Sequence, residues 1–320
     1  MKYALFLFLL FSNSISAQWY EKSFDVMGTR AKVEFEYHSA EVAEQLIKQV
    51  IEEMNRIDRL MSPFKNTSEL SRINLLASTK PITISDEMYQ LLKRSIEFSK
   101  ITNGAFDITF KSKGFNYDYP KKIRPNKKEL ERLVNNIDYQ NIKLNPESNT
   151  VFFTSKETKI DLGGIAKGHA VDLSIELLIS HGVKNAYVSA GGDSRVIGTK
   201  KDRMWYIGVK HPRDENKLIV NLPLQDVAIS TSGDYERFFI QDNIRYHHII
   251  DPSTGDSARK SQSVTIIASK GTDADAWSTS IFILGAKKGL ELINQVDDVS
   301  AIINDNEGRM SFSEDIVSAN

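Results

Sequence analysis

Asp161-Leu162-Gly163-Gly164-Ile165-Ala166-Lys167-Gly168 marks the point where an extended stretch ends and a helix, predicted over about 165–181, begins. Short strands are expected on both sides of this unit, at 151–154, 186–189, 205–209, 218–222, 227–231 and 263–268. A second helix is expected at about 272–294. Because strands and helices mix without regular alternation, the sequence predicts an α+β fold. We expect mixed, mainly antiparallel sheets with packed helices, in two closely associated lobes of one domain.

Helices dominate the first half of the chain. Ala31 to Tyr37 alternates as a strand does, and Glu41 to Leu60 then carries apolar residues at helical spacing. A second helix is predicted from Ser85 to about Asn103-Gly104, a common helix stop. A third is predicted over Asn126 to Val134, with Asn126 and Glu129 at the spacing of a capping box.

The N-terminus has the order of a secretory signal peptide. A positive start, an apolar run from Tyr3 to Phe11 and a small, polar exit predict a signal over 1–17 and a mature domain over 18–320. Cleavage after Ser16 competes with cleavage after Ala17, and a buried N-terminal strand is the alternative to a signal. The apolar run is far shorter than the ~20 residues of a membrane span.

Composition limits the classes of function. The chain has 320 residues, 41% hydrophobic and 26% charged, with a net charge of -1. This balance is ordinary for a globular enzyme and indicates no nucleic acid partner. The chain has no cysteine, so it has neither a disulfide nor a lipid anchor on a cysteine. We therefore expect an exported, soluble, periplasmic protein.

The Asp161–Gly168 segment suits a phosphate, because glycine turns and helix N-termini present backbone N–H groups and Lys167 adds a charge. It is not a P-loop, since His169 stands where the lysine belongs. A plain glycine-rich turn explains it equally well. A basic stretch over 111–128 has the same two interpretations, a phosphate contact or a solvated loop.

Two further segments are rich in glycine, aspartate and hydroxyl residues. Ser189-Ala190-Gly191-Gly192-Asp193 is a strand that enters a tight turn, in which Asp193 either faces a ligand or caps its own backbone. Ser230-Thr231-Ser232-Gly233-Asp234-Tyr235 offers hydroxyls that suit a polar ligand, and a simple turn is the rival interpretation.

The last segments are His247 to Gly255 and Thr272 to Thr279. Asp275 and Thr279 share one helix face, and with a backbone carbonyl they would form an oxygen site fit for Mg²⁺. Thr272 and Asp275 also form T-x-x-D, and a capping box is the simpler interpretation of that spacing. The twin histidines lack a third ligand at metal spacing, and a histidine before a turn is commonly structural.

In this order, the motifs resemble the FAD:protein FMN transferase family over about Phe24 to Ile303. The resemblance also rests on three earlier segments: Met27-Gly28-Thr29, Met61-Ser62 with Ser68 to Asn74, and Asn103-Gly104-Ala105-Phe106-Asp107-Ile108-Thr109. It implies that Asp275, Thr279 and the Gly164 carbonyl bind Mg²⁺ and that Lys167 faces the FAD pyrophosphate. The implied contacts to FAD, the substrate, are Met27, Phe64, Asp107, Lys167, Gly191, Gly192, Ser230, Thr231, Ser232, Gly233 and His248.

The implied reaction is transfer of FMN from FAD to a threonine hydroxyl of another protein, with release of AMP. His248 is a candidate general base, and Asp193 or Asp251 are alternatives; Lys167 completes the implied catalytic set. The implied acceptor is an exported FMN-binding domain of a membrane electron-transport complex. Two other functions stay open: hydrolysis of FAD to FMN and AMP, and a non-catalytic exported FAD-binding protein.

The chain departs from the family pattern at several positions. No lipid-anchor cysteine is present, so this member is expected to be free rather than tethered. Phe64 replaces a tyrosine that stacks on the flavin in many relatives, which keeps the ring and loses the hydroxyl. Phe110-Lys111-Ser112-Lys113 replaces the usual small and proline residues, so we expect that loop to be built differently.

Overall fold

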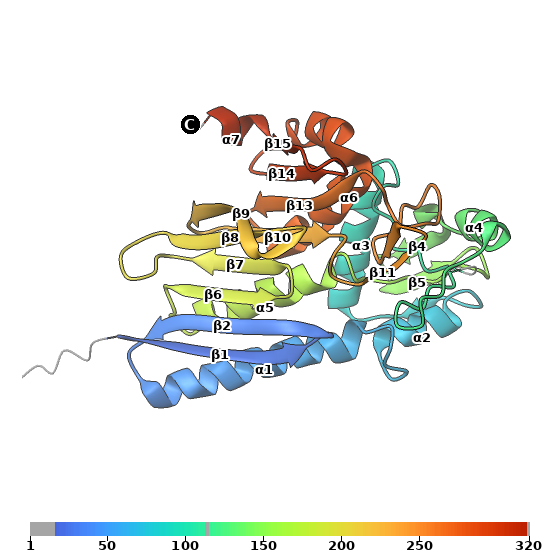
Figure 1. Ribbon diagram of the computed structural model, residues 1–320. Helices are drawn as coiled ribbons and strands as arrows, with labels where there is room; N and C mark the ends of the chain where they lie inside the picture. Colours follow the sequence, from blue (N-terminus) through green and yellow to red (C-terminus); the bar gives the residue numbers. More distant parts are fainter. Residues whose placement is uncertain (1–16, 113–114, 319–320) are drawn as a thin grey trace, which may run out of the picture.

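An eight-stranded sheet forms the centre of the computed structural model, which describes residues 17–112 and 115–318 (Figure 1). Its strands pair in the order β1 (Gln18–Val26), β2 (Thr29–Tyr37), β6 (Ala186–Ala190), β7 (Asp193–Ile197), β10 (Ala228–Gly233), β13 (Ser261–Ala268), β14 (Ser300–Asp305) and β15 (Met310–Phe312). Every neighbouring pair is antiparallel. Because β2 pairs with β6, the N-terminal hairpin lies beside the middle of the chain.

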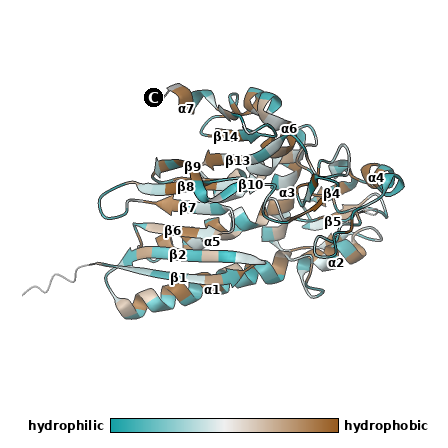
Figure 2. Cartoon of the chain, in the orientation of Figure 1, coloured by the Kyte–Doolittle hydropathy of each residue, from teal (hydrophilic) through white to brown (hydrophobic). Residues whose placement is uncertain are grey.

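Three long helices pack on this sheet: α1 (Ala40–Met61), α5 (Ala166–Ser180) and α6 (Gly271–Ile293). α1 carries hydrophobic and hydrophilic residues in alternation along its length (Figure 2). Leu46, Val50, Met54 and Ile57 of its predicted apolar stripe are buried in the core. α5 and α6 are predominantly apolar and contact each other as well as the sheet, so they are the most enclosed helices of the layer.

A smaller unit lies at the right of Figure 1. It contains the three-stranded sheet β3 (Ile82–Thr83), β5 (Thr150–Phe153) and β4 (Ile142–Asn145), together with α2 (Glu69–Leu76), α4 (Lys127–Val134) and the 3₁₀ turn Tyr139–Asn141. The helix α3 (Asp86–Ile101) lies between this unit and the large sheet and contacts α6 (Figure 1). The buried side chains of the smaller unit, such as Val151, belong to the same core cluster as Val188 of the large sheet. The predicted α+β class with mainly antiparallel sheets is confirmed.

Two separate ribbons and a short helix complete the fold. β8 (Trp205–His211) pairs with β9 (Asp214–Leu224), and β11 (Phe238–Gln241) pairs with β12 (Ile244–His247). The short helix α7 (Glu314–Ser318) follows β15. Within the described ranges, no helix combines the length and the apolar character that crossing a bilayer requires.

Most predicted elements are present at nearly the predicted bounds. The capping box of α4 is confirmed, since Asn126 and Glu129 bond each other's backbone N–H groups. The elements that were not predicted are the helices α2 and α7 and the strands β1, β3, β4, β7, β11, β12, β14 and β15. The predicted signal peptide lies outside the described residues except for Ala17, so it stays a prediction.

Candidate active site

The site is organised by the close crossing of α5 and α6. Gly168 and Gly271 meet there without intervening side chains: a Cβ on Gly168 would lie 2.0 Å from the Gly271 carbonyl oxygen. A Cβ on Gly271 would in turn lie 2.7 Å from the carbonyl oxygen of Gly168. Because the two backbones touch, Lys167 of α5 and Asp275 of α6 face each other across the crossing.

Lys167 joins two buried carboxylates. Its Nζ lies 2.7 Å from Asp193 Oδ2 and 3.2 Å from Asp275 Oδ2. The Gly168 backbone N–H also donates to Asp275 Oδ2, at 3.2 Å. Three residues far apart in sequence thus form one charged cluster at the turn into α5, and we call Lys167, Asp193 and Asp275 the charged cluster.

Burial and mutual charge shift the ionisation of this cluster. Burial, reinforced by the charge of Asp193 and opposed by Lys167, raises the pKa of Asp275 to about 7. For Lys167, burial lowers the pKa, but the two carboxylates outweigh it and hold the pKa above its usual range. The cluster therefore contains a firmly charged ammonium and a carboxyl that ionises near neutrality.

A row of hydroxyl groups extends from the charged cluster. Thr279 Oγ1 lies 3.4 Å from Ser232 Oγ, which lies 2.9 Å from Ser278 Oγ. Ser278 Oγ contacts Ser230 Oγ at 2.9 Å. Gly164 lies against Thr279, since a Cβ there would be 3.1 Å from Thr279 Oγ1. The structure thus brings together Gly164, Lys167, Asp193, Ser230, Ser232, Asp275 and Thr279.

The glycine turn at Gly191-Gly192 connects the hydroxyl row to the N-terminal hairpin. Thr231 donates its backbone N–H to Gly192 O at 2.9 Å, and a Cβ on Gly192 would come within 2.4 Å of Thr231 O. Gly191 has φ +63° and donates to Arg30 O. Gly192 therefore has no room for a side chain, which explains a glycine at this place.

The tip of the first hairpin is the two-residue turn Met27-Gly28, in which both residues have positive φ. Arg237 donates to Gly28 O at 3.3 Å, and His248 donates its backbone N–H to Arg237 O. Arg237 therefore connects the hairpin tip at Met27-Gly28 to the backbone of His248. Arg237 was not identified from the sequence.

Within the described part of the chain, Phe64, Asp107 and Asp251 form no hydrogen bond or ion pair with the charged cluster. Phe64 is 77% exposed, with Lys111 Nζ 5.3 Å from its ring centre. Asp107 is buried and accepts hydrogen bonds from Thr109 and from the Tyr139 backbone. Asp251 accepts from the backbone and hydroxyl of Ser253. Asp251 therefore stabilises its own turn, and Asp107 joins its loop to the 3₁₀ turn at Tyr139. Burial raises the pKa of Asp107 to about 6.

Two interpretations of local spacing are wrong. The capping-box interpretation of Thr272 and Asp275 fails because α6 begins at Gly271, and Asp275 turns instead to Lys167 and Gly168. The simple turn proposed for Ser230 to Tyr235 is mostly strand β10, paired with β7 and β13. Tertiary contacts override the local pattern at both places.

Two charged features of the site were missed. Lys111 pairs with Asp161 at 2.6 Å, and Asp161 Oδ1 accepts from the Gly163 N–H, so the loop around Lys111 holds the glycine turn. Asp172, on α5, accepts from the first turn of α6. The sequence signal available for Asp172 was an acid within the apolar helix 165–181, which contains one other acid, Glu176.

The twin histidines are both neutral at physiological pH. Burial lowers the pKa of His247 to about 4, although its ring contacts Ala258 O at 2.8 Å. Burial also lowers the pKa of His248 to about 3, helped by the charges of Arg237 and Lys167, and its buried Nδ1 lacks a hydrogen-bond partner. His247 supports the fold, and Nδ1 of His248 is available for a further hydrogen bond.

Lowering the pH from 7 to 5 is expected to reduce the free energy of unfolding by about 2 kcal/mol through His247 alone. The folded-state pKa of about 4 lies below the unfolded value, so the stabilisation exists above the ordinary pKa of 6.5 and is lost as pH falls toward 4. Urea unfolding at pH 7, 6 and 5 measures this. His247→Gln should show a shallower pH dependence, and an equal slope would contradict the prediction.

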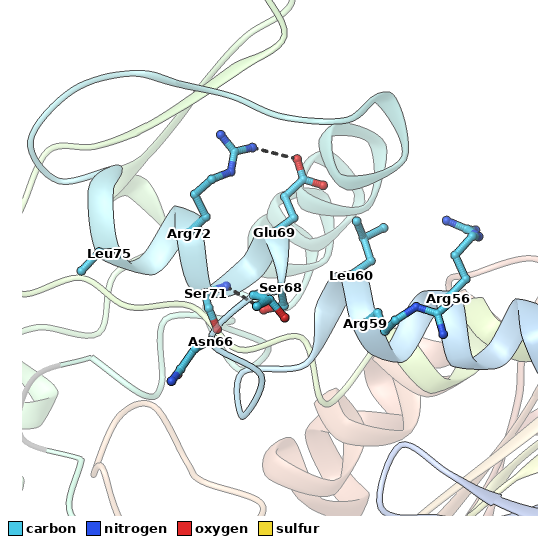
Figure 3. Close-up of a pocket in the computed structure, with 10 residues that line it drawn as sticks. Arg56, Arg59, Leu60, Asn66, Ser68, Glu69, Ser71, Arg72 and Leu75 are labelled. Atoms are coloured by element: carbon cyan, nitrogen blue, oxygen red, sulfur yellow. Dashed lines mark hydrogen bonds and ion pairs between the residues drawn. The ribbon is translucent and has the colours of Figure 1, made fainter.

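A surface groove of about 750 Å³ lies between the end of α1 and α2 (Figure 3). It is lined by arginines that are already paired: Arg56 with Glu53 and Glu87, Arg59 with Glu52, and Arg72 with Glu69. Paired guanidinium groups leave little charge for an anionic ligand. The charged cluster, and not this groove, is the candidate for chemistry.

Comparison with known proteins agrees with this geometry. A family-wide profile described as the ApbE family matches residues 27–303. The chain is 30% identical over 318 residues to the FAD:protein FMN transferase of Treponema pallidum, covering 93% of this chain and 88% of that protein. The ApbE protein from Thermotoga maritima superposes with a TM-score of 0.87 at 34% identity, covering 94% and 99% of the two chains. Flavin transferase ApbE from Vibrio cholerae does so with a TM-score of 0.83 at 26% identity, covering 95% and 99%. The resemblance seen in the sequence is confirmed, and the chain belongs to the ApbE family.

Proposed function

We propose that this protein transfers the FMN moiety of FAD to a threonine hydroxyl of another protein, with Mg²⁺ as cofactor and AMP as the second product. The observation that carries the proposal is the Lys167 ammonium held between Asp193 and Asp275 at a glycine turn that begins a helix. Such turns suit phosphate groups. Relatives named FAD:protein FMN transferase support the choice of substrate.

The residues around Asp275 fit a magnesium ion. Asp275, Thr279 and the carbonyl of Gly164 offer only oxygen donors, which are the ligands Mg²⁺ prefers. Asp193 Oδ1 is buried without a hydrogen-bond partner, so the site has unused negative charge. Asp275, Thr279 and Gly164 would hold the ion, which would neutralise charge on the pyrophosphate oxygens.

The protein's own groups would position and neutralise the substrate. Lys167 would face the pyrophosphate, because its ammonium is fixed by two carboxylates. The threonine oxygen would bond to the FMN phosphorus as the bond from that phosphorus to the AMP oxygen breaks. The hydroxyl proton would pass to the neutral ring of His248, whose low pKa the negative charge of bound FAD would raise, and AMP would leave with the electron pair of the broken bond. We choose His248 over Asp251, which caps its own turn, and over Asp193, which pairs with Lys167.

FAD would lie across the glycine turns beside the charged cluster. The pocket would be lined by two segments, the glycine turn Gly191-Gly192 and the strand segment Ser230-Thr231-Ser232-Gly233. Met27 at the hairpin tip and Phe64 would contact the isoalloxazine ring. Asp107 would act through its loop, because its oxygens are already bonded to Thr109 and Tyr139.

Phe64→Ala is expected to raise the KM for FAD about fivefold to tenfold, because a stacked aromatic pair contributes about 1 kcal/mol. The turnover number should stay within about twofold, since Phe64 is not placed at the reacting phosphate. Steady-state kinetics at saturating Mg²⁺ measure both, with Phe64→Tyr expected to bind FAD normally. Leu75→Ala, at another exposed apolar side chain, is the control. Equal KM values for Phe64→Ala and Leu75→Ala would contradict flavin stacking.

The acceptor would be an exported FMN-binding domain of a membrane electron-transport complex, and the protein itself would be periplasmic and soluble. The acceptor is inferred from the family resemblance, and the location from the predicted signal peptide and the absence of cysteine. Because the acceptor is a separate protein, the test requires the purified acceptor domain.

The test incubates the full mature chain with FAD, Mg²⁺ and the candidate acceptor domain. Intact mass spectrometry follows the acceptor, and released AMP is measured in parallel. A mass gain equal to FMN that disappears without Mg²⁺ supports the transferase. AMP and free FMN without a mass gain indicate hydrolysis, in which water replaces threonine. Intact, tightly bound FAD would replace the proposal by a non-catalytic binding protein.

A further inference from the structure

Asp172 is a buried acid in the apolar helix α5, and its carboxylate accepts four hydrogen bonds. Oδ1 accepts from the backbone N–H of Gly271 at 2.7 Å and from Arg195 Nη1 at 3.0 Å. Oδ2 accepts from the backbone N–H and the hydroxyl of Thr272, both at 2.8 Å. The cap residue of α6, Lys270, makes no side-chain capping bond. The N-terminus of α6 is therefore capped by a residue of a different helix.

Each element joined by Asp172 carries one member of the charged cluster. Asp172 follows Lys167 on α5, and Gly271 and Thr272 precede Asp275 on α6. Arg195 lies two residues after Asp193 on β7, so both side chains leave the same face of the sheet. One carboxylate thus fixes the relative positions of α5, α6 and β7 within a few residues of the cluster.

We propose that Asp172 is a positioning residue of the flavin-transfer site. Asp172 sets the distance between Asp275 and the Lys167–Asp193 pair without contacting substrate. The inference rests on the proposed function, in which Asp275 holds Mg²⁺. A second contact, the ion pair between Arg94 and Asp273 at 2.8 Å, also holds the first turn of α6, but it connects that turn only to α3. Asp172 alone of the two connects α6 to the elements that carry Lys167 and Asp193.

The negative charge of Asp172 is needed because all four partners are donors. In Asp172→Asn the amide NH₂ would face either Gly271 N–H and Arg195, or both donors of Thr272. The NH₂ group would then face hydrogen-bond donors where the carboxylate oxygen accepted from them. This repulsion would move the first turn of α6 away from α5. Residues that orient a metal ligand typically change metal affinity or activity about 10- to 100-fold when replaced.

The experiment titrates Mg²⁺ alone into the full chain and follows the midpoint of thermal unfolding, which yields a dissociation constant. Asp172→Asn is expected to weaken Mg²⁺ binding about tenfold or more. Thr272→Val removes a single hydrogen bond and keeps the carboxylate, so a smaller weakening is expected. A parallel assay should show the turnover number falling at saturating Mg²⁺, with the KM for FAD less affected.

Asn126→Ala is the control for a general loss of stability. It removes the capping box of α4, outside the contacts described for Asp172, and costs about 1 kcal/mol. Its Mg²⁺ binding should equal that of the wild type despite the lower melting temperature. If Asp172→Asn fails to fold, Thr272→Val carries the same test.

Two outcomes distinguish this inference from the proposed function. Wild-type Mg²⁺ affinity and turnover in Asp172→Asn or Thr272→Val, with only a lower melting temperature, would overturn the positioning role. A wild-type chain that neither responds to Mg²⁺ nor cleaves FAD would instead count against the proposed function.

Discussion

Asp275→Ala is expected to lower the rate of FMN transfer by about 10²–10³-fold, the cost typical of losing one preorganised electrostatic contact. Asp275 is the carboxylate proposed to hold Mg²⁺, and it also lies 3.2 Å from Lys167. Removing Asp275 would weaken Mg²⁺ binding and would also leave the Lys167 ammonium less firmly placed, so both positive charges facing the pyrophosphate are affected. The measurement is the rate of mass gain of the acceptor as a function of Mg²⁺ concentration.

The fold should survive this change. Lys167 keeps its 2.7 Å contact with Asp193, and the buried carboxyl that is lost already ionises with difficulty. Asp273→Ala is the matched control on the same helix, since it breaks the pair with Arg94 and leaves the charged cluster intact. We expect Asp273→Ala to retain most activity. Equal activities in the two variants would refute the metal-binding role of Asp275.

Gly168→Ala is expected to destabilise the protein by about 3 kcal/mol, within the range observed for overpacked cores. The new Cβ would lie 2.0 Å from the Gly271 carbonyl oxygen and 2.9 Å from Asp275 Cβ, and the first of these atoms belongs to the backbone. The helices have to separate, which moves Lys167 away from Asp275. A misplacement of ~1 Å can cost about 10²-fold in rate.

Denaturant unfolding and the transfer assay together measure this effect. Gly208→Ala is the control, because the three atoms nearest its Cβ would all belong to the side chain of Leu218, which is 55% exposed and free to move. That variant should be near wild type in both stability and rate. A Gly168→Ala protein with normal stability would show that α5 and α6 can separate without cost.

Elements with a strong local signal were predictable from sequence. The apolar stripe of α1 and the capping box of α4 are written in consecutive residues, and the structure agrees with both. β1 was missed because it is an edge strand that pairs only with β2, so its outward residues do not alternate clearly. β14 lies inside the sheet, and because five of its six residues are buried its sequence does not alternate between apolar and polar residues.

The site was predictable only in part, because its geometry is made by tertiary contacts. Lys167 and Asp275 meet across 108 positions of sequence, and no local spacing encodes that contact. The spacing of Thr272 and Asp275 suggested a cap, whereas the actual cap comes from Asp172 on another helix. The resemblance to a family supplied the residues that spacing left ambiguous.

The strand order also has a consequence for how the chain folds. Ala31 in the first hairpin pairs with Ala190, and the partner of Lys167, Asp275, lies on a helix that begins only at Gly271. Contacts of such long range form slowly, because the loop between them must close before they stabilise anything. Synthesis alone therefore cannot produce an active intermediate: the ammonium and its two carboxylates assemble only after nearly the whole chain has emerged.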